Sequence, residues 1–301
     1  MIIFIDENDE NKRLDSYLSE VTSNFSRSKI QNFIKNGKVT VNDKIIKPSY
    51  LLKENDKIEF EFIEEDKSLR IEAQNIPLEI VYEDENMIVV NKPSGMLTHP
   101  TSIEKDNTLV NALIYKFGEC LSDINGEFRR GILHRLDRNT SGLLMIAKNN
   151  KAHEFLANQI KEHSIIKKYR AVVKGIIKED EFEINKPIGR NPNHPEKMAI
   201  VENGKESKTI VKVLERFKEN TYIELNLITG RTHQIRVHMK SINHPVYNDT
   251  LYGAGVGKVK TEEQVLQSYY LRFTKPFGNE IIELTIEPDE KISKVLKCLR
   301  S

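Results

Sequence analysis

The sequence predicts an α+β protein in which a small N-terminal unit precedes a larger second unit. Strand patterns outnumber helix patterns and do not alternate with them regularly, which argues against a doubly wound parallel sheet. A polar, acidic stretch without periodicity at 63–76 is predicted to be a linker between units at 12–62 and 77–301. A chain of 301 residues is long enough for one large and one small domain.

The first unit begins with two predicted helices. Leu14, Leu18 and Val21 recur at helical spacing in the first. The second has Ser26 as its N-cap and ends at Gly37. Its apolar face is formed by Ile30, Phe33 and Ile34. Strands are expected to follow these helices, so that the unit is a compact α/β module.

The strands of this module are indicated by alternation. Val39 and Val41 alternate with polar residues, and the pair Asn42-Asp43 predicts a turn after them. A closing strand is predicted where the aromatic and aliphatic positions Ile58, Phe60 and Phe62 alternate with glutamates.

The second unit is predicted to contain mostly strands. The apolar run 143–147 has the length of a buried strand. Further strands are predicted at 168–174, 208–217, 221–229 and 281–287. Helices are predicted at 150–163 and 231–242, where apolar residues recur on one face.

The distribution of charge indicates a nucleic-acid partner, although the net charge is only +1. Six basic residues and one acidic residue lie between positions 26 and 47, and ten basic and three acidic residues lie between 129 and 170. Two basic surfaces on a balanced chain are what contact with phosphates requires. For either segment alone, an ordinary solvated face is an equally good explanation.

Several classes of protein are excluded. The chain has two cysteines, Cys120 and Cys298, which are too few and too far apart for a disulfide framework or a metal site. No apolar stretch approaches the roughly 18 residues of a membrane span, and no signal peptide is recognisable. We therefore expect a cytoplasmic protein without a metal.

The most informative segment is 131–148. It places one carboxylate, Asp137, among several arginines, followed by a buried strand. Arg135 and Arg138 are in this segment, and Arg129 and Arg130 come directly before it. Because the guanidinium groups already neutralise the carboxylate, a metal ligand is a poor explanation. An ionised carboxylate that faces a polyanionic substrate explains the pattern better.

Four ordered blocks, at 79–100, 131–148, 168–175 and 230–239, resemble pseudouridine synthases of the ribosomal-large-subunit type. The second block, His-Arg-Leu-Asp followed by Thr-Ser-Gly-Leu-Leu, is similar to the one that surrounds the family's catalytic aspartate. The resemblance implies a mixed, bent, largely antiparallel sheet with the active cleft across its middle. It also implies isomerisation of uridine, which exchanges no electrons and needs no cofactor.

The same resemblance implies roles for individual residues. Asp137 corresponds to the catalytic carboxylate, Arg231 to its guanidinium partner and Tyr169 to the tyrosine that stacks on the target base. Arg135 corresponds to the arginine that fills the space left by a flipped nucleotide, and Arg138 is expected to contact RNA. On the residues alone, a structural ion pair between Asp137 and Arg231 would be the better explanation. The histidines of these blocks, His134, His233 and His238, are interpreted as structural or RNA-facing.

The first unit resembles the S4 RNA-binding domain. The resemblance rests on 13–15, 26–29, 34–42 and 56–58, and it departs at Asn55, where the family has glycine. Asparagine tolerates a left-handed backbone, so the turn should be preserved. RNA contacts are expected from the basic residues of this unit, namely Arg27, Lys29, Lys35 and Lys38.

These observations predict an RNA pseudouridine synthase that acts as a monomer on structured RNA, with large-subunit ribosomal RNA as the favoured substrate. Two alternatives remain open. One is a synthase for transfer RNA, and the other is a non-catalytic RNA-binding or ribosome-assembly factor that keeps the fold.

Overall fold

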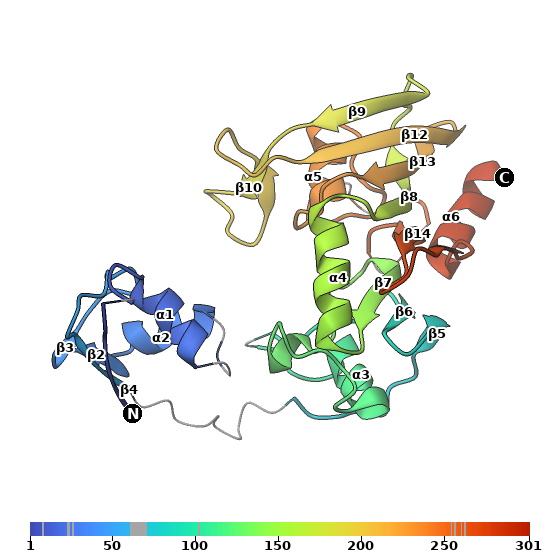
Figure 1. The fold of residues 1–301 in the computed structure, drawn as a ribbon. Coiled ribbons are helices and arrows are strands. Elements are labelled where there is room, and N and C mark those ends of the chain that lie inside the picture. The colour runs from blue at the N-terminus through green and yellow to red at the C-terminus, as the bar shows by residue number, and fades with distance from the viewer. Residues whose placement is uncertain are drawn as a thin grey trace. The chain divides into compact units, whose positions relative to one another are not determined.

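The computed structural model describes residues 1–7, 9–22, 25, 27–60, 71–101, 103–253, 255, 257–259, 261 and 263–301. The chain divides into two compact units, Met1–Arg70 and Ile71–Ser301 (Figure 1). Each unit has its own hydrophobic core. No helix among the described residues is both long and apolar enough to cross a membrane.

The first unit is a four-stranded antiparallel sheet with two helices. Its strands lie in the order β1-β4-β2-β3 and have the bounds β1 Ile2–Phe4, β2 Val39–Val41, β3 Lys44–Ile45 and β4 Lys57–Phe60. The helices are α1 Leu14–Val21 and α2 Arg27–Lys35. Both predicted helices and the predicted strand at 39–41 are confirmed, and the closing strand predicted over positions 58 to 62 is confirmed as far as Phe60. Strand β1 was not predicted, and it pairs with the edge of β4.

Residues with positive φ make the turns of this unit. Gly37 follows α2 with φ +71°, and Asn42 and Asp43, with φ of 50° and 62°, form the predicted turn between β2 and β3. Asn55 has φ 66°, so asparagine does occupy a left-handed position where the S4 family has glycine. Ser26, the predicted N-cap, and Phe62, the last position of the predicted closing strand, lie outside the described residues.

The second unit is built on one nine-stranded sheet within the described residues. The strand order is β5-β6-β7-β14-β8-β13-β12-β9, and β15 pairs with β14. The bounds are β5 Glu79–Glu83, β6 Met87–Lys92, β7 Ser141–Ala147, β8 Ile166–Lys174, β9 Glu181–Asn185, β12 Lys208–Arg216, β13 Asn220–Leu227, β14 Leu266–Thr274 and β15 Ile281–Thr285. A separate hairpin consists of β10 Ile188–Arg190 and β11 Met198–Ile200.

The sheet is mixed and largely antiparallel, as predicted. All its strand pairs are antiparallel except β7 with β14. Strands β6 and β7 are buried on both faces, because alternate side chains enter different clusters. Ile88 and Leu144 belong to the largest core, whereas Met87 and Leu143 pack in a second cluster with Leu156 of helix α4 (Asn150–Lys161). This burial explains the uninterrupted apolar runs in the sequence.

Three further helices pack on this sheet: α3 Leu109–Phe117, α5 Gln234–Ser241 and α6 Glu290–Arg300 (Figure 1). Helix α5 contributes Ile235 and Met239 to the largest core, which it shares with β8 and β13. Helix α6 packs Ile292 and Val295 against residues of β8 and β13 in another cluster. Strands β8 and β13 at the centre of the sheet are therefore held from two sides.

The predicted helix at 150–163 and the strands at 168–174, 208–217, 221–229 and 281–287 are confirmed, with ends shifted by up to two residues. The helix predicted at 231–242 begins only at Gln234. His233, immediately before it, has φ 56° and ψ 18°, a left-handed conformation that starts the helix later than the apolar pattern indicates.

The linker was predicted to end at residue 76, but it ends earlier, because residues from Ile71 onward belong to the second unit. Ile71 is only 8% exposed and belongs to the largest core. The Gln74 N–H donates to the Asn111 carbonyl, and the Asn111 amide donates to the Glu72 carbonyl. The polar composition of residues 71–76 indicated a linker, but backbone groups of this segment form hydrogen bonds with the second unit.

The joint between β7 and β14 predicts a specific sensitivity. Gly142 has φ +115°, and a Cβ there would lie 2.0 Å from the Ser268 carbonyl oxygen. Gly95 also has positive φ, +87°, but a Cβ there would meet no heavy atom within 4 Å. We expect Gly142→Ala to lower the free energy of unfolding by about 1–3 kcal/mol more than Gly95→Ala, because only the first adds a backbone clash to the dihedral strain.

Thermal and denaturant unfolding of the two variants would test this expectation. Gly95→Ala controls for the cost of placing an L side chain at positive φ. Equal stabilities of the two variants would show that the β7–β14 joint can move apart to admit a methyl group.

Candidate active site

Asp137 lies in a rigid loop that leads into β7. The preceding residue, Leu136, is buried, and its carbonyl accepts a hydrogen bond of 2.8 Å from the Thr98 hydroxyl. The Thr140 N–H donates to the Asp137 carbonyl, which closes the turn. The Asp137 backbone is therefore fixed on both sides, while its side chain keeps 18% of its surface exposed.

A buried ammonium group holds this loop against the end of β6. Lys92 is completely buried, and its Nζ donates to the carbonyl oxygens of Pro93, Met96 and Arg138 at 2.8–3.0 Å. Burial lowers the pKa of Lys92 to about 7, and the three carbonyl oxygens favour its charged form. Lys92 thus joins the loop after β6 to the residue that follows Asp137.

The guanidinium partner of Asp137 is Arg236, from α5. Its Nη1 donates to Asp137 Oδ2 at 3.1 Å. Its Nε and Nη2 donate to the two carboxylate oxygens of Asp249 at 2.7 and 2.9 Å. Burial opposes the charge on Arg236, but its hydrogen bonds to Asp249 and the attraction of both carboxylates raise its pKa above the ordinary arginine value. The fork of Arg236 is therefore fully oriented before any substrate binds.

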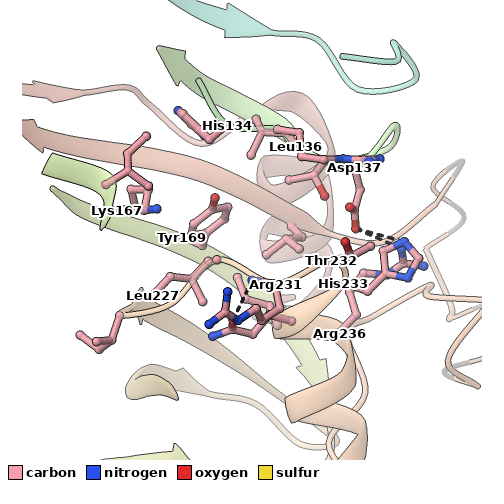
Figure 2. A pocket seen from close by; sticks show the side chains of 18 of the residues that line it. His134, Leu136, Asp137, Lys167, Tyr169, Leu227, Arg231, Thr232, His233 and Arg236 are labelled. Carbon is pink, nitrogen blue, oxygen red and sulfur yellow. Dashed lines mark hydrogen bonds and ion pairs between the residues drawn. The ribbon is translucent and has the colours of Figure 1, made fainter. Parts of the chain in front are cut away.

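The predicted pairing of Asp137 with Arg231 is wrong. Arg231 is exposed, and its Nε donates to the Glu206 carbonyl at 3.0 Å. The physical reason is the late start of α5, since the left-handed residue His233 leaves Arg231 in the turn before the helix. Arg231 still lines the same cavity as Asp137, but at a different place (Figure 2).

His233 is the second neighbour of the carboxylate. Its Nε2 lies 3.8 Å from Asp137 Oδ2, and its Nδ1 is 2.8 Å from the Tyr252 hydroxyl. Burial lowers the pKa of His233, although Asp137 counteracts part of that effect. Arg236 and His233 both approach Oδ2, and Oδ1 has no hydrogen bond to any described residue. One oxygen of Asp137 is thus left for a substrate.

Tyr169 forms the floor of the cavity. It lies on β8, is 6% exposed and belongs to the largest core. Burial raises the pKa of its phenol to about 12. The Ser268 hydroxyl lowers this pKa somewhat, and the charge of Asp137 raises it. At neutral pH the ring is therefore a protonated, largely apolar surface, which suits stacking on a flat base.

The cavity above this floor has a volume of about 510 Å³. Figure 2 shows Asp137, His233 and Arg236 at one end, Tyr169 in the middle, and His134 and Lys167 at the other. The volume is within the range of small-molecule sites. The described residues contain no group of three or more His, Cys, Asp or Glu side chains placed to hold a metal ion.

The two arginines beside Asp137 differ in position. Arg135 is exposed and lines the cavity. Arg138 is exposed outside the cavity, where it forms an ion pair with Glu104. Arg135 thus faces the cavity, whereas the Arg138 guanidinium group is already paired with Glu104.

The basic residues predicted to bind RNA in the first unit are all on or directly after α2. Arg27 donates to the buried carboxylate of Asp15 at 3.1 Å, and the Lys29 ammonium lies 5.0 Å above the Phe25 ring. Lys35 and Lys38 are exposed. A shallow hollow of about 520 Å³ in the same unit is lined by Arg13, Gln31, Ile34, Lys35, Ile45, Ile46, Lys47, Pro48 and Ser49.

Comparison with known proteins agrees with this geometry. Residues 86–241 match the RNA pseudouridylate synthase family, and residues 12–58 match the S4 domain. The first match includes Asp137, Tyr169 and Arg236 and spans more than half of the chain. The chain belongs to the RNA pseudouridylate synthase family.

Relatives of the synthase match it over nearly their full length. It is 39% identical over 294 residues to the uncharacterized RNA pseudouridine synthase YlyB of Bacillus subtilis, covering 98% of this chain and 96% of that protein. It is 37% identical to the ribosomal large subunit pseudouridine synthase D of Zymomonas mobilis, covering 95% and 93%. The solved structure of human RNA pseudouridylate synthase domain containing 1 is 28% identical, with a TM-score of 0.57, and the match covers 75% of this chain and 95% of that one.

Family membership resolves one of the alternatives that the sequence left open, because the synthase is an enzyme and not a non-catalytic factor that keeps only the fold. Sequence reasoning missed Arg236, Asp249 and Tyr252. The available signal for Arg236 was its place in the sequence between the apolar residues Ile235 and Val237, because a charge in an apolar stretch requires a partner.

The geometry predicts that Arg236 is far more sensitive to substitution than Arg231. Arg236→Lys keeps the charge but cannot hold Asp249 and Asp137 with one planar fork. We expect it to lower the single-turnover rate of pseudouridine formation by about 10²-fold or more, which is the scale of losing one oriented electrostatic group. Arg231→Lys should lower the rate less than about fivefold.

Both variants should be assayed at saturating RNA, with melting temperatures recorded to confirm folding. A greater loss for Arg231→Lys than for Arg236→Lys would restore Arg231 as the essential arginine.

Proposed function

We propose that the synthase isomerises specific uridines in structured RNA, most suitably in large-subunit ribosomal RNA, with Asp137 as the catalytic carboxylate. The observation that carries the proposal is the position of Asp137. It is the only carboxylate among the described residues that line the cavity, and its Oδ1 is left free beside the Tyr169 floor. A carboxylate in that place can attack C1′ of the ribose or stabilise positive charge there.

The reaction needs little besides this carboxylate and an apolar floor. The C1′–N1 bond breaks and its electron pair leaves with N1, while the charge at C1′ is balanced by Asp137. The base turns on the Tyr169 ring, a C1′–C5 bond forms, C5 loses its proton and N1 gains one. No atom is added or removed overall. Arg236 keeps the Asp137 carboxylate oriented throughout, because the position of Arg236 is itself fixed by Asp249.

The nature of the entrance supports a flipped nucleotide as the substrate. Tyr169 is 6% exposed at the foot of the cavity, so a base reaches it only when the base leaves its helix. Exposed Arg135 at the mouth could fill the space that the nucleotide leaves. Ribosomal RNA is favoured because several relatives, including the one from Zymomonas mobilis, are named large-subunit pseudouridine synthases, and because an S4 domain suits structured RNA.

Asp137→Asn tests the catalytic role. The amide is nearly isosteric but can neither attack nor stabilise positive charge, so turnover should fall below detection. RNA affinity should stay within a few fold, because the surrounding arginines still attract phosphates. Measurable turnover by the purified variant would remove Asp137 from the nucleophile's role. Pseudouridine mapping in total RNA with and without the protein would distinguish ribosomal from transfer RNA.

The first unit should contribute RNA affinity that depends on salt. We expect the joint replacement of Arg27, Lys29, Lys35 and Lys38 by Gln to weaken binding. The slope of log affinity against log salt should fall by roughly 0.7–0.9 for each phosphate that the variant no longer neutralises. The single-turnover rate at saturating RNA should be unchanged.

A matched control removes four exposed lysines that lie outside both basic segments, namely Lys178, Lys212, Lys218 and Lys297. Affinity should be measured at several salt concentrations. If the two fourfold variants show the same decrease in affinity and slope, the basic residues of the first unit are an ordinary solvated face.

A further inference from the structure

Lys167 is a buried cation without a partner among the described residues. It lies on β8, is 8% exposed and lines the cavity. None of the described residues forms a hydrogen bond or ion pair with its Nζ. Burial alone acts on its charge and lowers its pKa below the ordinary lysine value. Because desolvating an ammonium group is costly unless it is hydrogen-bonded, a group of this kind calls for a ligand.

At the end of the cavity where Lys167 lies, the described wall contains no carboxylate. His134 is held neutral, since its Nε2 accepts from the Met145 N–H at 3.1 Å and burial lowers its pKa to about 3. Other ionisable groups in the described wall are Lys161 at the end of α4, His163 after that helix, Arg231 and the Tyr169 phenol. The described lining includes one carboxylate, that of Asp137, which is at the opposite end (Figure 2).

Lys167 and Tyr169 are two positions apart on one strand and point to the same face, roughly 7 Å apart along it. Figure 2 shows Tyr169 between Lys167 and Asp137. The wall beside the ammonium is the backbone of Gly230, where a Cβ would lie 3.7 Å from Lys167 Nζ. A uracil that stacks on Tyr169 with its ribose at Asp137 therefore directs the edge opposite N1, which carries O4, toward Lys167.

We propose that Lys167 is a catalytic residue that donates a hydrogen bond from Nζ to O4 of the target uracil. This inference rests on the proposed function, since it places the ribose at Asp137. When the C1′–N1 bond breaks, the electron pair on N1 is conjugated through C6, C5 and C4 to O4. The ammonium stabilises the negative charge that develops there and keeps its own proton. It also selects uracil over cytosine, whose amino group at the same position donates instead of accepting.

A backbone phosphate is the competing acceptor, but the position of Lys167 disfavours it. Lys161 and His163 are exposed and suit phosphates that remain in solvent, whereas Lys167 is buried next to the stacking ring. The two acceptors predict different results, because a bond to phosphate affects affinity and its salt dependence, whereas a bond to the departing base affects the chemical step.

The test compares Lys167→Met with Lys168→Met. Lys168 is the adjacent residue, forms an ion pair with Glu224 and does not line the cavity. We expect Lys167→Met to lower the single-turnover rate by about 10²-fold, with RNA affinity within threefold and an unchanged salt slope. Lys168→Met should keep the wild-type rate. Melting temperatures check that each variant is folded.

Two further measurements identify the acceptor. RNA with 4-thiouridine at the target places sulfur, a weak acceptor, at position 4, so it should slow the wild type by a larger factor than it slows Lys167→Met. The wild-type rate should also fall as pH rises through the pKa of Lys167, at a lower pH than the phenol of Tyr169, whose pKa is about 12. Lys167→Met should lack that decline.

The outcomes separate this inference from the proposed function. A wild-type rate for Lys167→Met, or equal thio effects in both proteins, would overturn the role of Lys167 while an inactive Asp137→Asn left the proposed function standing. Lys167→Met could instead lower RNA affinity and reduce the slope of log affinity against log salt by about one, with an unchanged rate. That result would assign Lys167 to a phosphate and would also overturn its proposed role. Turnover by Asp137→Asn would remove the proposed function itself.

Discussion

The structure of the catalytic centre depends on one guanidinium group shared by two carboxylates. Asp249 is completely buried and takes two of the hydrogen bonds of Arg236, which leaves Nη1 for Asp137. Two carboxylates on one guanidinium group leave an excess of negative charge at this end of the cavity. In the proposed reaction, that is where C1′ of the ribose would become electron-poor. The arrangement is set before RNA binds, so little reorganisation is required during the reaction.

The hydrogen bond between Arg236 and Asp137 also requires a fixed arrangement of the β7 side of the sheet and the β8–β13 side. Asp137 precedes β7, whereas Arg236 lies 99 positions later on α5, which packs on β8 and β13. The parallel pairing between β7 and β14 connects these two sides, and Gly142 allows the Ser268 backbone to approach closely there. The same joint therefore sets both the continuity of the sheet and the distance between Asp137 and Arg236.

Local patterns in the sequence predicted seven of the fifteen strands that the described residues form. They also singled out Asp137 among its arginines, whereas Tyr169 was reached only through the resemblance to a known family. They failed where a single backbone conformation decided the outcome. The left-handed conformation of His233 is invisible to a pattern with a period of 3.6 residues, so the helix was predicted to begin too early. Lys167 was missed for a different reason. The alternation of a strand places it on the same face as Tyr169, but a lysine in a strand is normally assumed to face solvent.

Strand β8 shows how chemistry and scaffold are combined in one element. Tyr169 and Lys167 face the cavity, whereas Lys168 between them pairs with Glu224 of β13 away from it. Because β8 is held between β14 and β13, these cavity groups cannot shift to follow the shape of an RNA. Adaptation to a particular RNA must come from elsewhere, and exposed Arg135 and the basic residues of α2 lie outside this strand. In the proposed function, the groups on the central sheet would therefore serve the reaction itself, and the exposed basic residues would select the site on the RNA.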